Sequence, residues 1–89
     1  MIRKRIIFYG QVQHVGFRYR ARNAADHYGA TGWVRNEYDG SVTMEIQGNE
    51  QQIDLVILAI EKGRYIKIEN MSVMSLPLVE GERGFVTKI

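Results

Sequence analysis

The spacing of apolar residues changes several times along this 89-residue chain, and the order of the changes limits the folds that it can form. Two segments repeat apolar residues at helical spacing, one starting near Phe17 and one following Asn49. Five segments either alternate apolar and polar residues or are rich in β-branched residues, and both patterns are typical of strands. They are residues 4–12, 31–37, 41–47, 65–75 and 84–88. The predicted order is therefore strand, helix, strand, strand, helix, strand and a short last strand.

This order predicts an α+β sandwich of the ferredoxin-like type, in which two helices cover one face of an antiparallel sheet, with a short extra C-terminal strand. The length favours a single domain over residues 1–89. In a split βαβ arrangement the first two strands run parallel with the third between them, so they end at the same edge of the sheet. Residues 12–18 and Asn36 are therefore expected to be neighbours. The fold hosts many functions and selects none of them.

Local signals indicate where these elements begin, end and bend. Asn49 and Gln52 have the spacing of a capping box at the start of the second helix. Gly29 and Gly63 stand where the two helices are expected to stop. The alternation of the fourth strand slips near Asn70, which indicates a bulge or bend. Three methionines are expected in the core: Met44, Met71 and Met74.

Composition and charge exclude several classes of protein. The chain has no cysteine, so disulfides, thiolate zinc sites and a cysteine nucleophile are excluded. His14 and His27 have no obvious third partner, so no metal site is expected. A net charge of +2 is weak for a nucleic-acid binder, and none is expected as a partner. No apolar run approaches the about 20 residues of a membrane span, and no signal peptide is recognisable, so the expected location is cytoplasmic and away from membranes.

The connection between the first strand and the first helix is the first candidate site. Backbone N–H groups at a helix start attract anions, and a glycine at position 16 lets successive amides curl inward. Arg18 adds a planar fork of donors that suits a phosphate. These features predict a phosphate cradle made of five consecutive residues: His14, Val15, Gly16, Phe17 and Arg18. The competing interpretation is an ordinary turn whose arginine points to water.

Asn36 is the second candidate, because it ends the second predicted strand just before the Asp39-Gly40 turn. A carboxamide at this place can hold a water molecule through its donor and its acceptor. It can equally cap the hairpin, as asparagine often does. Glu37 and Asp39, on either side of the turn, are expected to be solvated.

Two separate segments resemble the signatures of the acylphosphatase family. Residues 10–18, GQVQHVGFR, are similar to the signature G-x-V-Q-G-V-G-F-R, and residues 32–36, GWVRN, with Gly40, Val42 and Gly48, are similar to the second. The resemblance implies a metal-independent hydrolase without cofactors that cleaves acyl phosphates to carboxylate and inorganic phosphate, the latter being product and inhibitor. It also implies that Arg18 and the amides of residues 14–18 hold the phosphoryl group and that Asn36 orients the attacking water. Nothing in the sequence demands more than a monomer.

His14 departs from the family pattern, which usually has glycine at this position. If the position needs a positive φ, a histidine there costs on the order of 1 kcal/mol or more, and if it does not, the imidazole could lie near the phosphate. A phosphate- or acyl-phosphate-binding module without turnover is therefore one alternative function. The other is a nucleic-acid-binding domain of the same fold, since residues 83–86, RGFV, resemble part of an RNA-recognition signature, though on a different strand.

Overall fold

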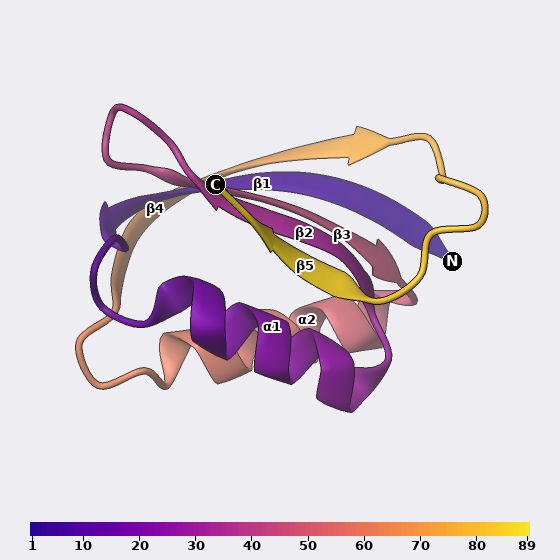
Figure 1. Ribbon diagram of the computed structural model, residues 1–89, viewed down its shortest axis with the longest axis horizontal. Helices are drawn as coiled ribbons and strands as arrows, with labels where there is room; N and C mark the ends of the chain where they lie inside the picture. The colour runs from indigo at the N-terminus through magenta and orange to yellow at the C-terminus, as the bar shows by residue number, and fades with distance from the viewer.

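The computed structural model describes residues 1–89, and its elements follow the predicted order (Figure 1). Each helix has 12 residues, and neither is long and apolar enough to cross a membrane. The elements are β1 (Ile2–Gln11), α1 (Phe17–Tyr28), β2 (Thr31–Asn36), β3 (Val42–Gly48), α2 (Glu50–Glu61), β4 (Lys67–Leu76) and β5 (Phe85–Lys88).

The strands form one sheet in the order β4-β1-β3-β2-β5. β1 and β2 are both antiparallel to β3 between them, so they run parallel to each other as the split βαβ order requires. Residues 77–84 cross the end of the sheet at which β4 ends and β1 and β2 begin (Figure 1). β5 therefore starts at that end and runs parallel to β2. The predicted ferredoxin-like fold with an extra C-terminal strand is confirmed, and this strand makes the sheet mixed rather than wholly antiparallel.

Both helices lie side by side on one face of the sheet, and the hydrophobic core fills the space between the two layers (Figure 1). The rings of Phe8 in β1 and Phe17 in α1 meet with centroids 4.8 Å apart, so the first turn of α1 is packed directly on β1. Phe85 is only 3% exposed and belongs to this core. It cannot stack on a base, which removes the observation that favoured a nucleic-acid-binding domain.

The helix boundaries follow the sequence signals with one correction. The capping box is confirmed, because Gln52 N donates to Asn49 Oδ1 and Asn49 N donates to Gln52 Oε1, both at 2.8 Å. Gly29 ends α1 in the left-handed region, with φ 76°. Gly63 is not a left-handed stop, because its φ is not positive and α2 already ends at Glu61. A Cβ at Gly63 would lie 2.5 Å from Ile66 Cδ1, so close packing explains the glycine.

The bulge predicted near Asn70 is confirmed, whereas two of the three methionines are not in the core. Asn70 pairs with Tyr9 and Ile68 pairs with Gly10, which leaves one extra residue in β4. Met44 on the central β3 is fully buried, but Met71 and Met74 on β4 are 36% and 56% exposed. β4 is an edge strand that is exposed along nearly its whole length, and an apolar pattern does not reveal which strand becomes the edge.

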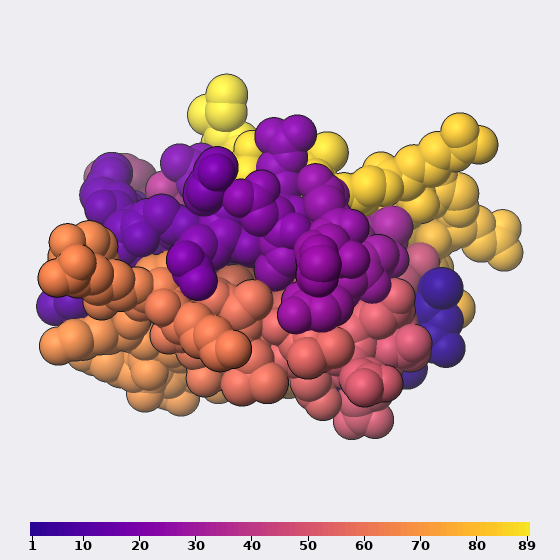
Figure 2. All heavy atoms as spheres, turned by 90° about the horizontal axis from the view of Figure 1, so that it is seen from below, coloured from indigo at the N-terminus to yellow at the C-terminus, as the bar shows by residue number.

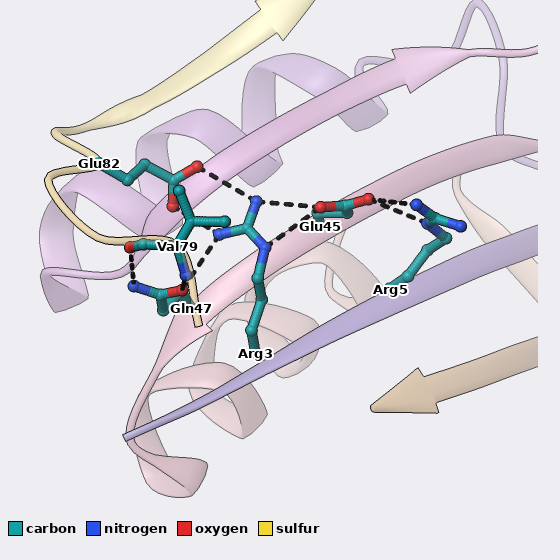
Figure 3. Close-up of polar contacts among 6 residues, drawn as sticks. All are labelled: Arg3, Arg5, Glu45, Gln47, Val79 and Glu82. Carbon is teal, nitrogen blue, oxygen red and sulfur yellow. Dashed lines mark hydrogen bonds and ion pairs between the residues drawn. The ribbon is translucent and has the colours of Figure 1, made fainter. Parts of the chain in front are cut away.

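The sheet face opposite the helices carries a buried ion network at the end where β1 begins (Figure 3). Its centre is Arg3, which is only 3% exposed. The guanidinium donates to three side chains: Glu45, Gln47 and Glu82. Gln47 in turn accepts from Val79 N at 2.9 Å and donates to Val79 O at 3.0 Å. These contacts hold residues 77–84 to the end of the sheet.

Candidate active site

The candidate site lies at the other end of the sheet, where the loop after β1 meets the turn between β2 and β3 (Figure 1). One side chain joins the two segments. Gln13 Nε2 donates to Glu37 O at 2.7 Å and to Ser41 O at 2.9 Å. The expected proximity of residues 12–18 and Asn36 is therefore confirmed, and both belong to the wall of one small hollow.

The loop backbone curls because two of its residues have positive φ. His14 has φ 61° and Gly16 has φ 81°, with a residue of ordinary handedness between them. Alternating handedness of this kind turns successive N–H groups toward one point and forms an anion-binding nest. His14 is the one non-glycine residue of the chain with a positive φ, so the strained conformation considered for this position is the one it adopts.

The backbone N–H groups of residues 14–18 are all free to bind a ligand. None of them donates a hydrogen bond to a backbone or side-chain acceptor. Gly16 is the N-cap of α1, and no side chain caps the helix there. Since α1 begins at Phe17, the positive end of its dipole points into the same space.

Arg18 stands in the first turn of α1 and is half-buried. Its Nη1 donates to Lys88 O in β5 at 3.4 Å, which is a long contact that leaves most of the guanidinium donors unused. The hollow beside it has a volume of about 170 Å³ and is lined by Val12, His14, Gly16, Phe17, Arg18, Tyr19 and Asn36. Val15, the remaining residue of the predicted cradle, instead lines a neighbouring hollow.

Asn36 ends β2 on the same side of the strand as the fully buried Val34, which is the side covered by the helices. Its side chain makes no hydrogen bond to the protein. The hairpin is instead closed by Asp39, whose Oδ1 accepts from Ser41 N at 2.9 Å and from Ser41 Oγ at 2.6 Å. Asn36 is thus not the cap of the turn, and its carboxamide remains available to a ligand or a water molecule.

The two carboxylates of the turn are engaged rather than simply solvated. Glu37 accepts from Arg35 Nη2 at 3.1 Å and from Thr43 Oγ1 at 2.6 Å. These two hydrogen bonds hold the pKa of Glu37 below its ordinary value, and the two from Ser41 do the same for Asp39. Both side chains are ionised near neutral pH, and neither lines the hollow. They shape the turn and leave the hollow without an acidic group.

No group of three or more His, Cys, Asp or Glu side chains lies together in a way that could hold a metal ion. The two histidines go to different places. His14 lines the hollow, whereas the His27 ring packs edge-on against Tyr28 with centroids 4.7 Å apart.

Sequence reasoning missed two residues that position the site, Gln13 and Lys88. Gln13 acts through main-chain carbonyls 24 and 28 residues away, and the Lys88 carbonyl contacts Arg18 across 70 residues. No spacing rule reaches such partners. The signals for Gln13 are its match to the glutamine of the first signature and its place at the entry to the loop, where a long carboxamide offers two donors to neighbouring carbonyls.

The fold and this hollow define a small α+β protein of the ferredoxin-like type with a hollow at a helix start that is lined by hydrogen-bond donors free of protein partners. Comparison with known proteins shows to which family within this class the chain belongs. The acylphosphatase family model matches residues 4–87. An acylphosphatase from Clostridium beijerinckii is 37% identical over 89 residues and covers 99% of each chain, and one from Oceanobacillus iheyensis is 45% identical over 69 residues, 75% of this chain and 76% of its own. The crystal structure of acylphosphatase from Bacillus subtilis superposes with a TM-score of 0.90 at 34% identity over the whole of both chains.

The chain therefore belongs to the acylphosphatase family and is a hydrolase of that family. This confirms the family and the enzyme class that the two sequence signatures indicated.

Proposed function

We propose that the protein hydrolyses the carboxyl–phosphate bond of acyl phosphates, giving a carboxylate and inorganic phosphate, by direct attack of water on phosphorus. The observation that carries the proposal is the hollow of about 170 Å³ in which Arg18, Asn36 and the curled loop converge. Its size suits a phosphoryl group and leaves the acyl group to project outward.

The phosphoryl oxygens would accept hydrogen bonds from the free amides of residues 14–18 and from the guanidinium of Arg18. The loop amides are fixed before the substrate arrives, because the loop is held by Gln13 and the first turn of α1 is packed on β1. Pre-organised donors of this kind stabilise the charge that spreads over the equatorial oxygens in the transition state.

Asn36 would hold the attacking water, with its carboxamide oxygen accepting from the water and its nitrogen donating to the water oxygen. The water oxygen forms a bond to phosphorus while the bond from phosphorus to the carboxylate oxygen breaks, and the proton of the water passes to the phosphate or to solvent. The leaving carboxylate is already a stable anion, so no general acid is required. Positioning and charge stabilisation are sufficient for an activated substrate of this kind.

The first test is hydrolysis of benzoyl phosphate by the purified protein in the presence of EDTA. We expect turnover to survive EDTA and to fall about 100- to 1,000-fold in both Arg18→Ala and Asn36→Ala, since removal of one pre-organised electrostatic donor costs about 10²- to 10³-fold. Arg22→Ala, which removes an exposed arginine one turn further along α1, is the matched control and should retain full activity.

The two roles are separated by titration with inorganic phosphate. Arg18→Ala should lose phosphate binding, whereas Asn36→Ala should keep most of it. If the Asn36 variant loses phosphate binding as completely as the Arg18 variant, the assigned roles are wrong. If the unmodified protein binds phosphate but hydrolyses nothing, the result supports the alternative function, a phosphate-binding module without turnover. The strained His14 in the loop would then be the first residue to examine as the cause.

A further inference from the structure

The order of the strands indicates the side of the loop toward which the acyl group of a bound substrate projects. In an in-line displacement the leaving group departs on the side of phosphorus opposite to the attacking water. β1 leads into the loop, and the sheet continues from β1 in two directions, through β3 to β2 on one side and to β4 on the other. Asn36 ends β2, so a water that it holds approaches from the β2 side. The acyl group then projects toward the start of β4.

A second hollow lies on that side of the loop. It has a volume of about 600 Å³ and shares His14 with the first, so the two hollows adjoin at His14. Figure 2 shows the segment before β4, in orange, lying against the indigo and purple loop at one end of the molecule. The hollow is lined by Gln11, His14, Val15, Arg64, Tyr65 and Lys67.

The charge in this second hollow is entirely positive. Arg64 and Lys67 are exposed, and neither takes part in any of the 4 ion pairs of the chain. No carboxylate is among the lining residues. The guanidinium carbon of Arg64 lies 5.6 Å from the centre of the Tyr65 ring, so an apolar surface stands beside the cation. The chemistry that fits is a short carbon skeleton with an anionic end.

We propose that this hollow is the acyl subsite and that Arg64 and Lys67 select acyl phosphates whose acyl group carries a second negative charge, a carboxylate or a phosphate. The inference rests on the proposed function, because it takes its direction from a water held by Asn36. Tyr65 packs against the carbon skeleton, and the two cations attract its anionic end. Arg64 and Lys67 are specificity-determining residues, while the phosphoryl group is bound by Arg18 and the loop amides.

The test compares two substrates of the same shape, 4-carboxybenzoyl phosphate and its neutral amide, 4-carbamoylbenzoyl phosphate. We expect the unmodified protein to have the lower KM for the carboxylate. In the double variant Arg64→Gln, Lys67→Gln, KM for the carboxylate should rise about three- to tenfold, as expected for two exposed ion pairs, while KM for the amide stays within about twofold. The preference of the unmodified protein should also shrink with added salt.

A second double variant, Lys62→Gln, Arg83→Gln, controls for the overall charge, because both of its residues are exposed and neither lines the hollow. It should keep the preference of the unmodified protein. Equal effects of the first double variant on both substrates, or a preference that survives in it, would overturn the subsite while leaving the proposed hydrolysis intact. Failure of the unmodified protein to hydrolyse either substrate would instead refute the proposed function, and the subsite with it.

Discussion

Arg3 and Arg18 stand near opposite ends of the sheet, and their surroundings differ in nearly every respect. Arg3 is 3% exposed and donates 5 hydrogen bonds to side chains around it (Figure 3). Arg18 is half-buried and makes a single contact, at 3.4 Å to Lys88 O. At one end of the sheet a buried arginine is held by side chains all round, whereas at the other end an arginine has one long contact and an asparagine side chain and a run of amides have no protein partner.

The difference shows how one small domain divides stability from binding. The hydrogen bonds that Arg3 donates to Glu82 and Glu45 raise its pKa above the ordinary value. Burial acts in the opposite direction but is outweighed. A buried charge that is fully paired fixes the segments around it, but removal of one partner leaves the others unpaired. The free donors at the loop contribute little to the stability of the fold, because they have no protein partner. They are instead available to bind an anion. The predictions below test this division, starting with the largest expected effect.

Arg3→Ala should destabilise the protein strongly without altering its chemistry. The substitution leaves Glu45 and Glu82 without their shared partner, and loss of one member of a buried ion pair costs about 3–5 kcal/mol. Urea unfolding gives the loss of stability, and hydrolysis of benzoyl phosphate by the folded fraction should be unchanged within about twofold.

Arg5→Ala is the matched control, because Arg5 contacts the same Glu45 but its side chain is 44% exposed. An exposed pair is worth about 1 kcal/mol at most. If the two variants unfold at the same urea concentration, burial of the Arg3 network is not what holds this end of the sheet.

Gln13→Ala should affect the other end differently, because it should lower turnover as well as stability. Its amide holds the loop to the turn after Asn36, so its removal lets the water-holding group and the phosphate cradle drift apart. A misplacement of this kind lowers kcat by about 10- to 100-fold, whereas loss of two hydrogen bonds costs about 1–3 kcal/mol of stability. Stopped-flow or steady-state hydrolysis measures the first, and urea unfolding the second.

Gln51→Ala, at an exposed position of α2 far from the loop, should leave both quantities unchanged. Unaltered kcat in Gln13→Ala would mean that the loop and Asn36 are aligned without this clamp.

The same contrast explains what the sequence could predict. Local rules were sufficient where partners are close along the chain: the capping box of Asn49 and Gln52 and the bulge near Asn70 are both present. They failed where an outcome depends on distant chain segments. Met74 is exposed because β4 became an edge, and Gly63 is small because Ile66 packs against it.

The candidate site shows the same limit. The signatures located the loop and Asn36, because both lie on short contiguous segments. They could not show that Val15 lines a different hollow from Arg18, or that the Lys88 carbonyl reaches the guanidinium. The ion network around Arg3 was missed altogether, since alternation assigns residues to a sheet face but does not reveal that residues 77–84 fold over that face and bury it.

Glu45 should make the stability of the protein depend on pH. Burial alone would raise the pKa of Glu45, but hydrogen bonds from Arg5 and Arg3 outweigh it and leave the pKa below the ordinary 4.5. The unfolded chain then takes up a proton at a higher pH than the folded one does. The stabilisation is complete above the unfolded pKa and is lost as the pH falls through the folded pKa.

Unfolding by urea at a series of pH values from 7 down to about 3 tests this linkage. Glu45→Gln should be less stable at pH 7 and should lose less stability on acidification than the unmodified protein. The engaged carboxylates of Glu37 and Asp39 leave some acid sensitivity in the variant. Parallel pH curves for the two proteins would show that Glu45 titrates alike in the folded and unfolded states.

His14→Gly should produce the smallest change and the only gain. A non-glycine residue in the left-handed region costs about 1–2 kcal/mol, and the greater freedom of glycine in the unfolded chain offsets about 0.4–1 kcal/mol of the relief. The variant should therefore be more stable by about 1 kcal/mol, measured by urea unfolding. Gly16→Ala is the opposite change at φ 81°, where no heavy atom lies within 4 Å of an added Cβ, so it should destabilise through backbone strain alone. A loss of stability in His14→Gly would mean that the imidazole makes a favourable contact outweighing the strain, and a loss of phosphate binding with it would place that contact at the anion.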